Sequence, residues 1–290
     1  MSTTRRNFLK QSSLLTAGLF IDKENWFKRK MPIGLQLYTV RADIAKDPQG
    51  VLAKIAQLGY KQVETFGYDE KRKWFGLTST ELSEALKKNG LTSPSGHTYR
   101  GGLFLKDNWE DTWKIAVEDS KAIGQEFIVV PWLETEFRSN DNYKKIAAGL
   151  NKAAEIAKQG GLKLAYHNHD FEFIITDGKS GFEILTSETD PKQVLFELDI
   201  FWAVKAGHDP LELFKQHPGR FPMWHVKDMD KTEKKDFTEV GNGVIDFAAI
   251  FKKAKESGLK YFFVEQDVCP GPPLESIAKS IAYLQKNIVK

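Results

Sequence analysis

Residues 143–169, YKKIAAGLNKAAEIAKQGGLKLAYHNH, indicate the fold class, because a helical pattern here passes through two glycines into a β-rich run. The pattern over Tyr143–Lys158 is typical of a helix, and glycine commonly stands where a helix ends. Lys163–His169 then predicts a strand. The same order of helix, glycine and strand recurs around Gly59-Tyr60-Lys61 and Gly258-Leu259-Lys260. Repetition of this unit is typical of a parallel sheet whose strands are joined by helices.

Eight β-rich runs follow residue 31. They are Ile33–Thr39, Gln62–Phe66, Thr92–His97, Phe127–Trp132, Lys163–His169, Val194–Ile200, Met223–Lys227 and Tyr261–Gln266. The helical patterns between them include Gln49–Leu58, Thr80–Lys88, Glu110–Ile123, Tyr143–Lys158, Asp209–Gln216 and Phe247–Glu256. Units of about 32 residues suit a closed (β/α)₈ barrel, so we predict a single-domain α/β TIM barrel over residues 31–290.

An open, doubly wound sheet is the alternative architecture. Such a sheet usually carries a glycine-rich phosphate-binding turn after its first strand. Here the first predicted strand runs into Tyr38-Thr39-Val40-Arg41 instead, which favours the barrel. The composition, with 41% hydrophobic and 28% charged residues, is that of a globular protein. Cys269 is the one cysteine, which excludes an internal disulfide framework and a cysteine-ligated zinc cluster.

The formal net charge of +3 is concentrated at the amino terminus. Residues 1–30 hold seven basic and two acidic side chains, whereas the remaining residues hold 35 and 37. Because a nucleic-acid-binding surface needs basic residues clustered on the folded domain, we expect no nucleic-acid partner.

The first thirty residues have the order of an export signal. Arg5 and Arg6 precede a short apolar run from Leu14 to Ile21, which resembles a twin-arginine (Tat) signal. We therefore expect residues 1–30 to be an export leader, or an N-terminal arm, and the protein to be periplasmic. The apolar run is too short to cross a bilayer, so we expect no stable membrane insertion.

Side chains that bind metals gather at the predicted strand ends, where a TIM barrel carries its active site. They are Glu64, His97, His167 and His169, Glu197 and Asp199, His225 and Lys227, and Glu265 and Asp267. Because side chains alternate along a strand, the two members of each pair share a face. Buried carboxylates and imidazoles need partners, and one divalent ion (Mn²⁺, Mg²⁺, Co²⁺ or Zn²⁺) would provide a shared one. As structural alternatives, Asp199 could cap the next helix and Glu265 could pair with Lys227.

The sequence resembles the xylose isomerase-like TIM-barrel family of sugar isomerases and epimerases, which includes inosose dehydratases and ketose 3-epimerases. The stretches that carry the resemblance are Gly34-Leu35-Gln36-Leu37-Tyr38, Gly59-Tyr60-Lys61-Gln62-Val63-Glu64, Phe196-Glu197-Leu198-Asp199, His225-Val226-Lys227-Asp228, Gly241-Asn242-Gly243 and Val264-Glu265. The resemblance implies one divalent metal held by a Glu, an Asp, a His and a second Glu from strands 5 to 8. Asp199, His225 and Glu265 match the last three positions. His167 stands in place of the first Glu, with His169 two residues further on.

This replacement bears on the chemistry. In the epimerases of the family, two metal-bound glutamates face each other across the sugar and act as base and acid. A metal-bound neutral imidazole is a poor base, because its lone pair is committed to the metal. We therefore assign proton transfer to one or more of four candidates, namely Glu265, His169, Lys227 and Glu64. The residues that we expect to contact the substrate are His97, Tyr38, Trp202 and Gln36.

The first functional hypothesis is a metal-dependent isomerase or epimerase that abstracts a proton next to a carbonyl of a carbohydrate or polyol. The alternative, motivated by His167, is a metal-dependent lyase or hydratase acting on keto-glycosides or inososes. A non-catalytic sugar-binding barrel and a glycosidase that uses two carboxylates alone are further alternatives. In each case the partner is a small-molecule sugar or glycoside, and a homo-oligomer is compatible with the sequence. We expect specificity to reside in the loops Asp69–Ser79, Tyr99–Trp109, Glu134–Asn142 and Asp230–Glu239.

Overall fold

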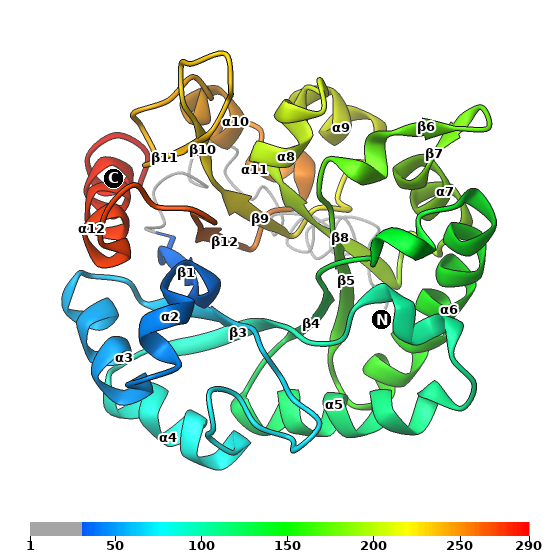
Figure 1. Cartoon of the computed structure of the whole chain (residues 1–290), viewed down its shortest axis with the longest axis horizontal. Helices are drawn as coiled ribbons and strands as arrows, with labels where there is room; N and C mark the ends of the chain where they lie inside the picture. The colour runs from blue at the N-terminus through cyan, green and yellow to red at the C-terminus, as the bar shows by residue number, and fades with distance from the viewer. Residues whose placement is uncertain (1–30, 290) are drawn as a thin grey trace, which may run out of the picture.

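The computed structural model describes residues 31–289. Eight parallel strands close into a barrel in the order β1-β12-β9-β8-β5-β4-β3-β2, and helices surround it (Figure 1). The barrel strands are β1 (Gly34–Gln36), β2 (Gln62–Thr65), β3 (Thr92–His97), β4 (Phe127–Val130), β5 (Lys163–His167), β8 (Val194–Asp199), β9 (Met223–Val226) and β12 (Tyr261–Val264). The predicted single-domain TIM barrel is therefore confirmed.

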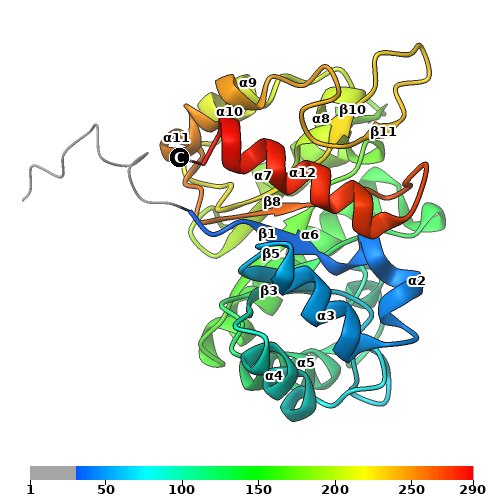
Figure 2. The same ribbon diagram turned by 90° about the vertical axis from the view of Figure 1, so that its left-hand side faces the viewer.

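Helices form the outer layer. They are α2 (Arg41–Ile44), α3 (Pro48–Gln57), α4 (Ser79–Lys88), α5 (Trp109–Ile123), α6 (Asn140–Gln159), α7 (Gly181–Glu188), α8 (Ile200–Lys205), α9 (Pro210–Gln216), α10 (Phe247–Phe251), α11 (Ala254–Ser257) and α12 (Pro273–Asn287). Short 3₁₀ helices occupy Leu37–Val40, Gly101–Leu105, Thr135–Phe137 and Phe171–Phe173. Capping residues in the local sequence determine where several helices begin. At α4, for example, Thr78 and Glu81 form a capping box. Figure 2 shows α12 along the outside of the barrel, above α3.

The first strand is shorter than the sequence predicts. The predicted strand Ile33–Thr39 ends at Gln36, because the Gln36 side chain accepts a hydrogen bond from the Tyr38 N–H (3.0 Å) and starts a 3₁₀ helix. The other barrel strands begin at the predicted residue and end there or one or two residues earlier. The predicted helix Phe247–Glu256 is divided into α10 and α11, where the Lys253 N–H bonds to the carbonyl of Ile250 instead of continuing the helical pattern.

Residues that point into the barrel form layers along its axis. Inside the barrel Phe127, Val129, Ala165, Met223 and Phe263 form an apolar cluster. Because side chains alternate along a strand, the residues two positions after Ala165, Met223 and Phe263 also point inward. These are His167, His225 and Glu265. The sequence thus closes the bottom of the barrel with apolar groups and gathers ionisable groups at its carboxyl end.

Two small hairpins interrupt the alternation of strand and helix. One pairs β6 (Ile175–Thr176) with β7 (Lys179–Ser180), and the other pairs β10 (Asp228–Met229) with β11 (Phe237–Thr238). The loop that joins β10 and β11 projects from the molecule in Figure 2. The Asp228 carboxylate fixes the base of this segment, since it accepts hydrogen bonds of 2.8–3.2 Å from the backbone N–H groups of Met229, Gly241, Gly243 and Ile245.

The predicted export leader, residues 1–30, lies outside the described residues. Across residues 31–289, none of the helices combines the length and the apolar character needed to cross a membrane.

Candidate active site

Two groups of ionisable side chains meet at the carboxyl end of the barrel and share His225. The outer group is Asp199, His225 and Glu265, and the inner group is His97, His167, Glu197 and His225. Within each group the potential ligand atoms lie within 4.8 Å of one another, and all of the residues are buried. Imidazole nitrogens and carboxylate oxygens are suitable ligands for a divalent transition metal, so each group could hold one.

The outer group contains three of the four residues predicted as metal ligands, and the fourth, His167 of the inner group, lies next to it. His225 Nδ1 lies 2.6 Å from Glu265 Oε2 and 4.0 Å from Asp199 Oδ2. His167 Nε2 lies 3.6 Å from the same Asp199 oxygen. Asp199 also caps α8, because its other oxygen accepts the Trp202 N–H at 3.0 Å. The helix-capping role and the place in the cluster therefore coexist in one carboxylate.

Lys227 places its ammonium group among the outer carboxylates. Its Nζ lies 2.8 Å from Asp199 Oδ2, 2.6 Å from Glu265 Oε2 and 3.1 Å from Asp267 Oδ2. The pairing of Glu265 with Lys227, one of the alternatives that the sequence leaves open, is thus present together with the cluster. A divalent ion bound by these oxygens would share them with the ammonium or displace it.

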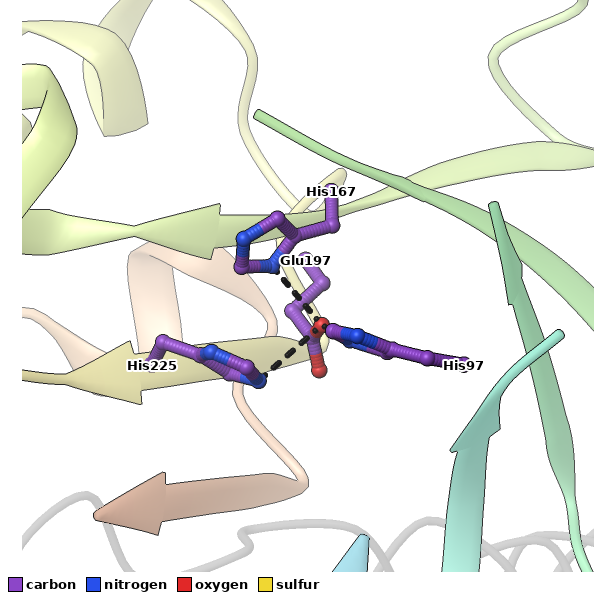
Figure 3. Close-up of side chains that lie close together, drawn as sticks. All are labelled: His97, His167, Glu197 and His225. Carbon is purple, nitrogen blue, oxygen red and sulfur yellow. Dashed lines mark hydrogen bonds and ion pairs between the residues drawn. The ribbon is translucent and has the colours of Figure 1, made fainter. Parts of the chain in front are cut away.

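Glu197 lies at the centre of the inner group, surrounded by three imidazole rings (Figure 3). Its Oε2 is 2.8 Å from His97 Nε2, 3.0 Å from His167 Nδ1 and 3.1 Å from His225 Nε2. Glu64 Oε2 is 2.6 Å from the same nitrogen of His225. Two buried carboxylates, Glu197 and Glu64, thus lie within hydrogen-bond distance of the ring nitrogens of these histidines.

The inner hydrogen bonds orient the rings toward the outer group. His225 presents Nε2 to Glu64 and Glu197, and Nδ1 to Glu265 and Asp199. His167 likewise presents Nδ1 to Glu197 and Nε2 to Asp199. A histidine that donates one N–H to a carboxylate and directs its other nitrogen outward has the arrangement of a metal ligand. The donor set therefore fits a divalent ion in the outer group, while Glu197 and Glu64 support it from behind.

Gln36 and Glu64 lie behind His225 and do not line the cavity described below. Gln36 Nε2 donates to Glu64 Oε2 at 2.7 Å, and both side chains are fully buried. Gln36 was predicted to contact substrate and Glu64 to transfer a proton. In the structure Glu64 contacts the ring of His225 and Gln36 contacts Glu64, and the two assigned roles stay predictions.

The buried charges shift the pKa values of the three inner histidines in different directions. Burial alone would lower the pKa of His97, but Glu64 and Glu197 outweigh it and raise the pKa to about 9. Burial also opposes charge on His225, yet the carboxylates of Glu197, Glu265 and Glu64 raise its pKa well above the usual value. Burial, followed by the charge on His225, lowers the pKa of His167. A metal ion binding at His225 Nδ1 must therefore replace a proton.

The outer group combines a strongly charged lysine with carboxylates of unequal acidity. Burial opposes charge on Lys227, but Asp199, Asp267 and Glu265 raise its pKa well above the usual value. Burial raises the pKa of Asp199, and it raises that of Asp267 to about 6. Burial acts in the same direction on Glu265, but there Lys227 and His225 prevail and lower the pKa. Glu265 is thus the outer carboxylate that most strongly retains its negative charge.

A cavity of about 830 Å³ opens above the outer group. His167, Lys227 and Glu265 line it, so the cluster is accessible to a small molecule. Three of the four predicted substrate contacts, His97, Tyr38 and Trp202, also line this cavity. The volume is within the usual range for a site that encloses a small ligand.

His169 lies on the cavity wall. Its ring stacks on Phe171 (5.4 Å between centroids) and meets Trp132 edge to face (4.6 Å). The Glu172 carboxylate accepts the His169 backbone N–H at 2.7 Å. Burial, followed by the charge on Lys227, lowers the pKa of His169, and its buried Nδ1 has no hydrogen-bond partner among the described residues. His169 is therefore a neutral imidazole that faces the cavity and is available for proton transfer.

The sequence-based assignment of roles omits three residues of the site: Glu197, Asp267 and Glu172. Glu197 is recognisable only as the inward neighbour of Asp199 on one strand, and nothing in the local sequence shows that three histidines surround it. Asp267 lies one residue after the predicted strand Tyr261–Gln266 and three residues after the end of β12. Glu172 carries no motif. Its position follows from the 3₁₀ turn Phe171–Phe173, which directs it back under His169.

Comparisons with known proteins agree with this architecture. The chain is 29% identical over 169 residues to the inosose dehydratase of Lacticaseibacillus casei, a match that covers 52% of this chain and 56% of that protein. The match thus spans little more than half the length of that relative. For the inosose dehydratase of Clostridium botulinum, the identity is 29% over 242 residues, with 71% of this chain and 80% of the relative covered.

Among solved structures, a sugar phosphate isomerase/epimerase from Parabacteroides distasonis superposes with a TM-score of 0.78 at 29% identity, covering 90% of this chain and 96% of that one. The family described as xylose isomerase-like TIM barrel matches residues 52–287. Its match covers most of the barrel, including the inner and outer groups. The chain belongs to the xylose isomerase-like TIM-barrel family of enzymes, whose members include proteins that modify sugars.

Proposed function

We propose that this protein is a divalent-metal-dependent lyase that eliminates a substituent from a keto-sugar or keto-cyclitol after removing the proton next to the carbonyl. The observation that carries the proposal is the distribution of ionisable groups around the cavity. The carboxylates that line it, Glu265 and Asp267, both follow β12. At the ends of β3 and β5 the lining contains the imidazoles of His97, His167 and His169 and the guanidinium group of Arg100, with no carboxylate among them.

This distribution favours elimination over epimerisation. Epimerisation through an enolate needs proton transfer on opposite faces of the sugar ring, and the epimerases of this family use two facing glutamates for it. Here His167 occupies the position of the first glutamate, and its nitrogens face Glu197 and Asp199. An elimination on one face of the ring needs only one group, which takes the proton from carbon and returns it to the departing oxygen.

His169 is the residue that we assign to this proton transfer. Its imidazole is neutral because its pKa is lowered, and it lines the cavity. It would accept the proton from the carbon next to the carbonyl. As imidazolium it would then donate that proton to the oxygen of the leaving hydroxyl or alkoxyl group, so that water or an alcohol departs and the carbon–carbon double bond forms. The stacked ring of Phe171 and the edge of Trp132 hold the imidazole in orientation.

The outer group supplies the complementary interaction. His167, Asp199, His225 and Glu265 would hold the metal ion, which when bound polarises the carbonyl oxygen and makes the neighbouring C–H more acidic. Lys227, held among three carboxylates, would donate a hydrogen bond to the same carbonyl oxygen, on which negative charge develops. The names of the inosose dehydratase relatives support an elimination, and the match to them is partial.

Product analysis tests the proposal. Metal-stripped and metal-reloaded protein would be incubated in D₂O with keto-sugars, methyl keto-glycosides and inososes, and followed by NMR and mass spectrometry. We expect metal-dependent loss of water or alcohol, and we expect His169→Gln to lower kcat/KM by about a hundredfold or more. His208→Gln, at an exposed histidine outside the site, is the matched control. Elimination that persists without metal, or is unaffected by His169→Gln, would contradict the proposal.

An isomerase or epimerase is the second candidate, favoured by the name of the Parabacteroides distasonis structure. The same experiment separates the two activities. An epimerase yields a product of unchanged composition that carries solvent deuterium, whereas a lyase yields a product lighter by the lost group.

We also propose that the protein is exported through residues 1–30. Support comes from the paired Arg5-Arg6 ahead of the apolar run. Replacing both arginines by lysine should retain the full-length protein in the cytoplasm, as measured by cell fractionation. Export at the wild-type level would refute the assignment.

A further inference from the structure

A second cavity, of about 650 Å³, adjoins the one above the metal-binding cluster. Tyr68, Thr98 and Arg100 line both, so the two spaces meet along this line of residues. The wall of the second cavity comes from the segments after β2, β3 and β4 and from the first turns of α5. Three of the loops predicted to determine substrate specificity contribute to these segments, namely Asp69–Ser79, Tyr99–Trp109 and Glu134–Asn142.

Hydrogen bonds and an ion pair fix the walls of this second cavity. The Tyr68 hydroxyl donates to Asp119 Oδ2 at 2.6 Å, and Arg72 binds both oxygens of Asp119. These bonds attach the segment after β2 to α5. On the opposite side Gly102 donates its N–H to Glu134 at 3.2 Å, and a Cβ at Gly102 would come within 2.8 Å of that carboxylate. The close approach keeps the loop backbone against Glu134, so the shape of the cavity is built into the fold.

The lining is suited to a neutral polyhydroxylated ligand. Tyr99, Trp109 and Phe137 supply aromatic surface, on which the C–H face of a sugar ring can pack. Charges of both signs are present, since Arg100 and Lys106 occur together with Glu70 and Asp107, and none of these four forms an ion pair with another described residue. With Glu134 and with Arg72, which pairs with Asp119, the lining carries three acidic and three basic side chains, and this balance favours hydroxyl groups over a phosphate or carboxylate.

The start of α5 adds hydrogen-bond donors to this lining. Asn108, the N-cap residue, has a left-handed backbone conformation (φ 56°), and its side chain makes no capping hydrogen bond. The first N–H groups of a helix have no partner within the helix. Asn108 and Trp109 both line the cavity, so the uncapped start of the helix is beside the ligand space and can donate to hydroxyl oxygens.

We infer that the second cavity is a subsite for a further sugar ring, and that the substrate is a neutral disaccharide or longer glycoside whose oxidised ring lies over the metal-binding cluster. The inference rests on the proposed function for the identity of the reacting ring. A cavity of 300–1,000 Å³ is the usual size for one small ligand. Two joined cavities of about 830 and 650 Å³ therefore exceed what one sugar ring fills. Binding energy from the unreactive ring can then be used to position the reacting one.

The test compares keto-disaccharides with the matching methyl keto-glycosides, using metal-loaded full-length protein. Thr112→Trp would fill the second cavity from α5, and Glu118→Trp, at an exposed position of the same helix outside the cavity, is the matched control. We expect kcat/KM to be at least about tenfold higher for a disaccharide than for its methyl glycoside. Thr112→Trp should abolish this ratio and Glu118→Trp should preserve it. Equal rates in the wild type, or a ratio that survives Thr112→Trp, would overturn the subsite.

Ligand-observed NMR with the same disaccharides separates failure of the subsite from failure of the proposed function. If neither class of substrate is turned over, the proposed reaction is wrong, and disaccharide binding alone decides the subsite. Saturation transfer to both rings that disappears in Thr112→Trp but remains in Glu118→Trp would support it. Transfer to one ring only, or no loss in Thr112→Trp, would refute it.

Discussion

Replacing Glu197 by glutamine tests whether the buried carboxylate supports the histidines that we propose as metal ligands. Glutamine has the same shape but removes the charge on an oxygen that lies 3.0 Å from His167 Nδ1 and 3.1 Å from His225 Nε2. A hydrogen bond to a charged acceptor contributes roughly 1 kcal/mol more than one to a neutral acceptor. Weakening the two bonds that orient the histidine rings should therefore reduce the binding free energy of the metal by about 2 kcal/mol, which corresponds to a loss of metal affinity of about thirtyfold. Substitutions of this kind typically reduce metal affinity by about 10–100-fold.

The assay is a competition titration of Zn²⁺ or Mn²⁺ against a fluorescent chelator, at one fixed pH, with wild-type and variant protein. Glu188→Gln, an exposed glutamate at the end of α7, is the control and should bind metal as the wild type does. Unchanged affinity in Glu197→Gln would refute the supporting role. A loss of about a thousandfold or more would instead identify Glu197 as a ligand, and would place the ion in the inner group.

Three further predictions concern metal binding, pH and a loop. Asp199→Asn should weaken metal binding by about a hundredfold or more in the same titration, and wild-type affinity would remove Asp199 from the ligand set. Burial raises the pKa of Glu172 from 4.5 to about 7, so its contribution to stability is greatest below about pH 4.5 and is lost as the pH rises to about 7. Urea unfolding at about pH 4 and about pH 8 measures this: the free energy of unfolding of the wild type should fall by about 3 kcal/mol more than that of Glu172→Gln. Parallel pH profiles of the two proteins would contradict this. Asp228→Asn should destabilise the protein by about 3 kcal/mol, because an amide oxygen can accept only half of the four backbone N–H bonds that the carboxylate accepts. Hydrogen exchange over residues 229–245 should become faster. Unchanged exchange would refute this prediction.

Sequence patterns were sufficient to predict the barrel. The segment Thr92–His97 was predicted with the observed bounds, and the other strands were placed at their correct starts except for the first. The strand ends were less accurate because side-chain capping decides where a strand stops. Asp199 illustrates this, since its carboxylate caps α8 and ends β8, whereas the predicted strand continued to Ile200.

The sequence predicted which residues enter the site but not how deeply each of them lies. Alternation along a strand shows that Glu64 and His225 point into the barrel, and their positions in sequence do not distinguish a cavity wall from the layer behind it. Glu64 and Gln36 lie in that second layer, because strands of a closed barrel are staggered. Glu64 of β2 meets the Nε2 side of the His225 ring, and Gln36 of β1 contacts Glu64. The role of Glu197 likewise depends on three histidines from three other strands, which become its neighbours only when the barrel closes.

The ammonium group of Lys227 gives the site a built-in counter-ion. Structural zinc domains unfold without their metal, because nothing else compensates their ligands. Here Asp199, Glu265 and Asp267 are already neutralised in part by a lysine from the neighbouring strand. Assembly of the barrel would therefore not depend on an ion to balance these carboxylates. An ion bound by the outer group would enter an assembled barrel and would share the oxygens with the ammonium group or displace it.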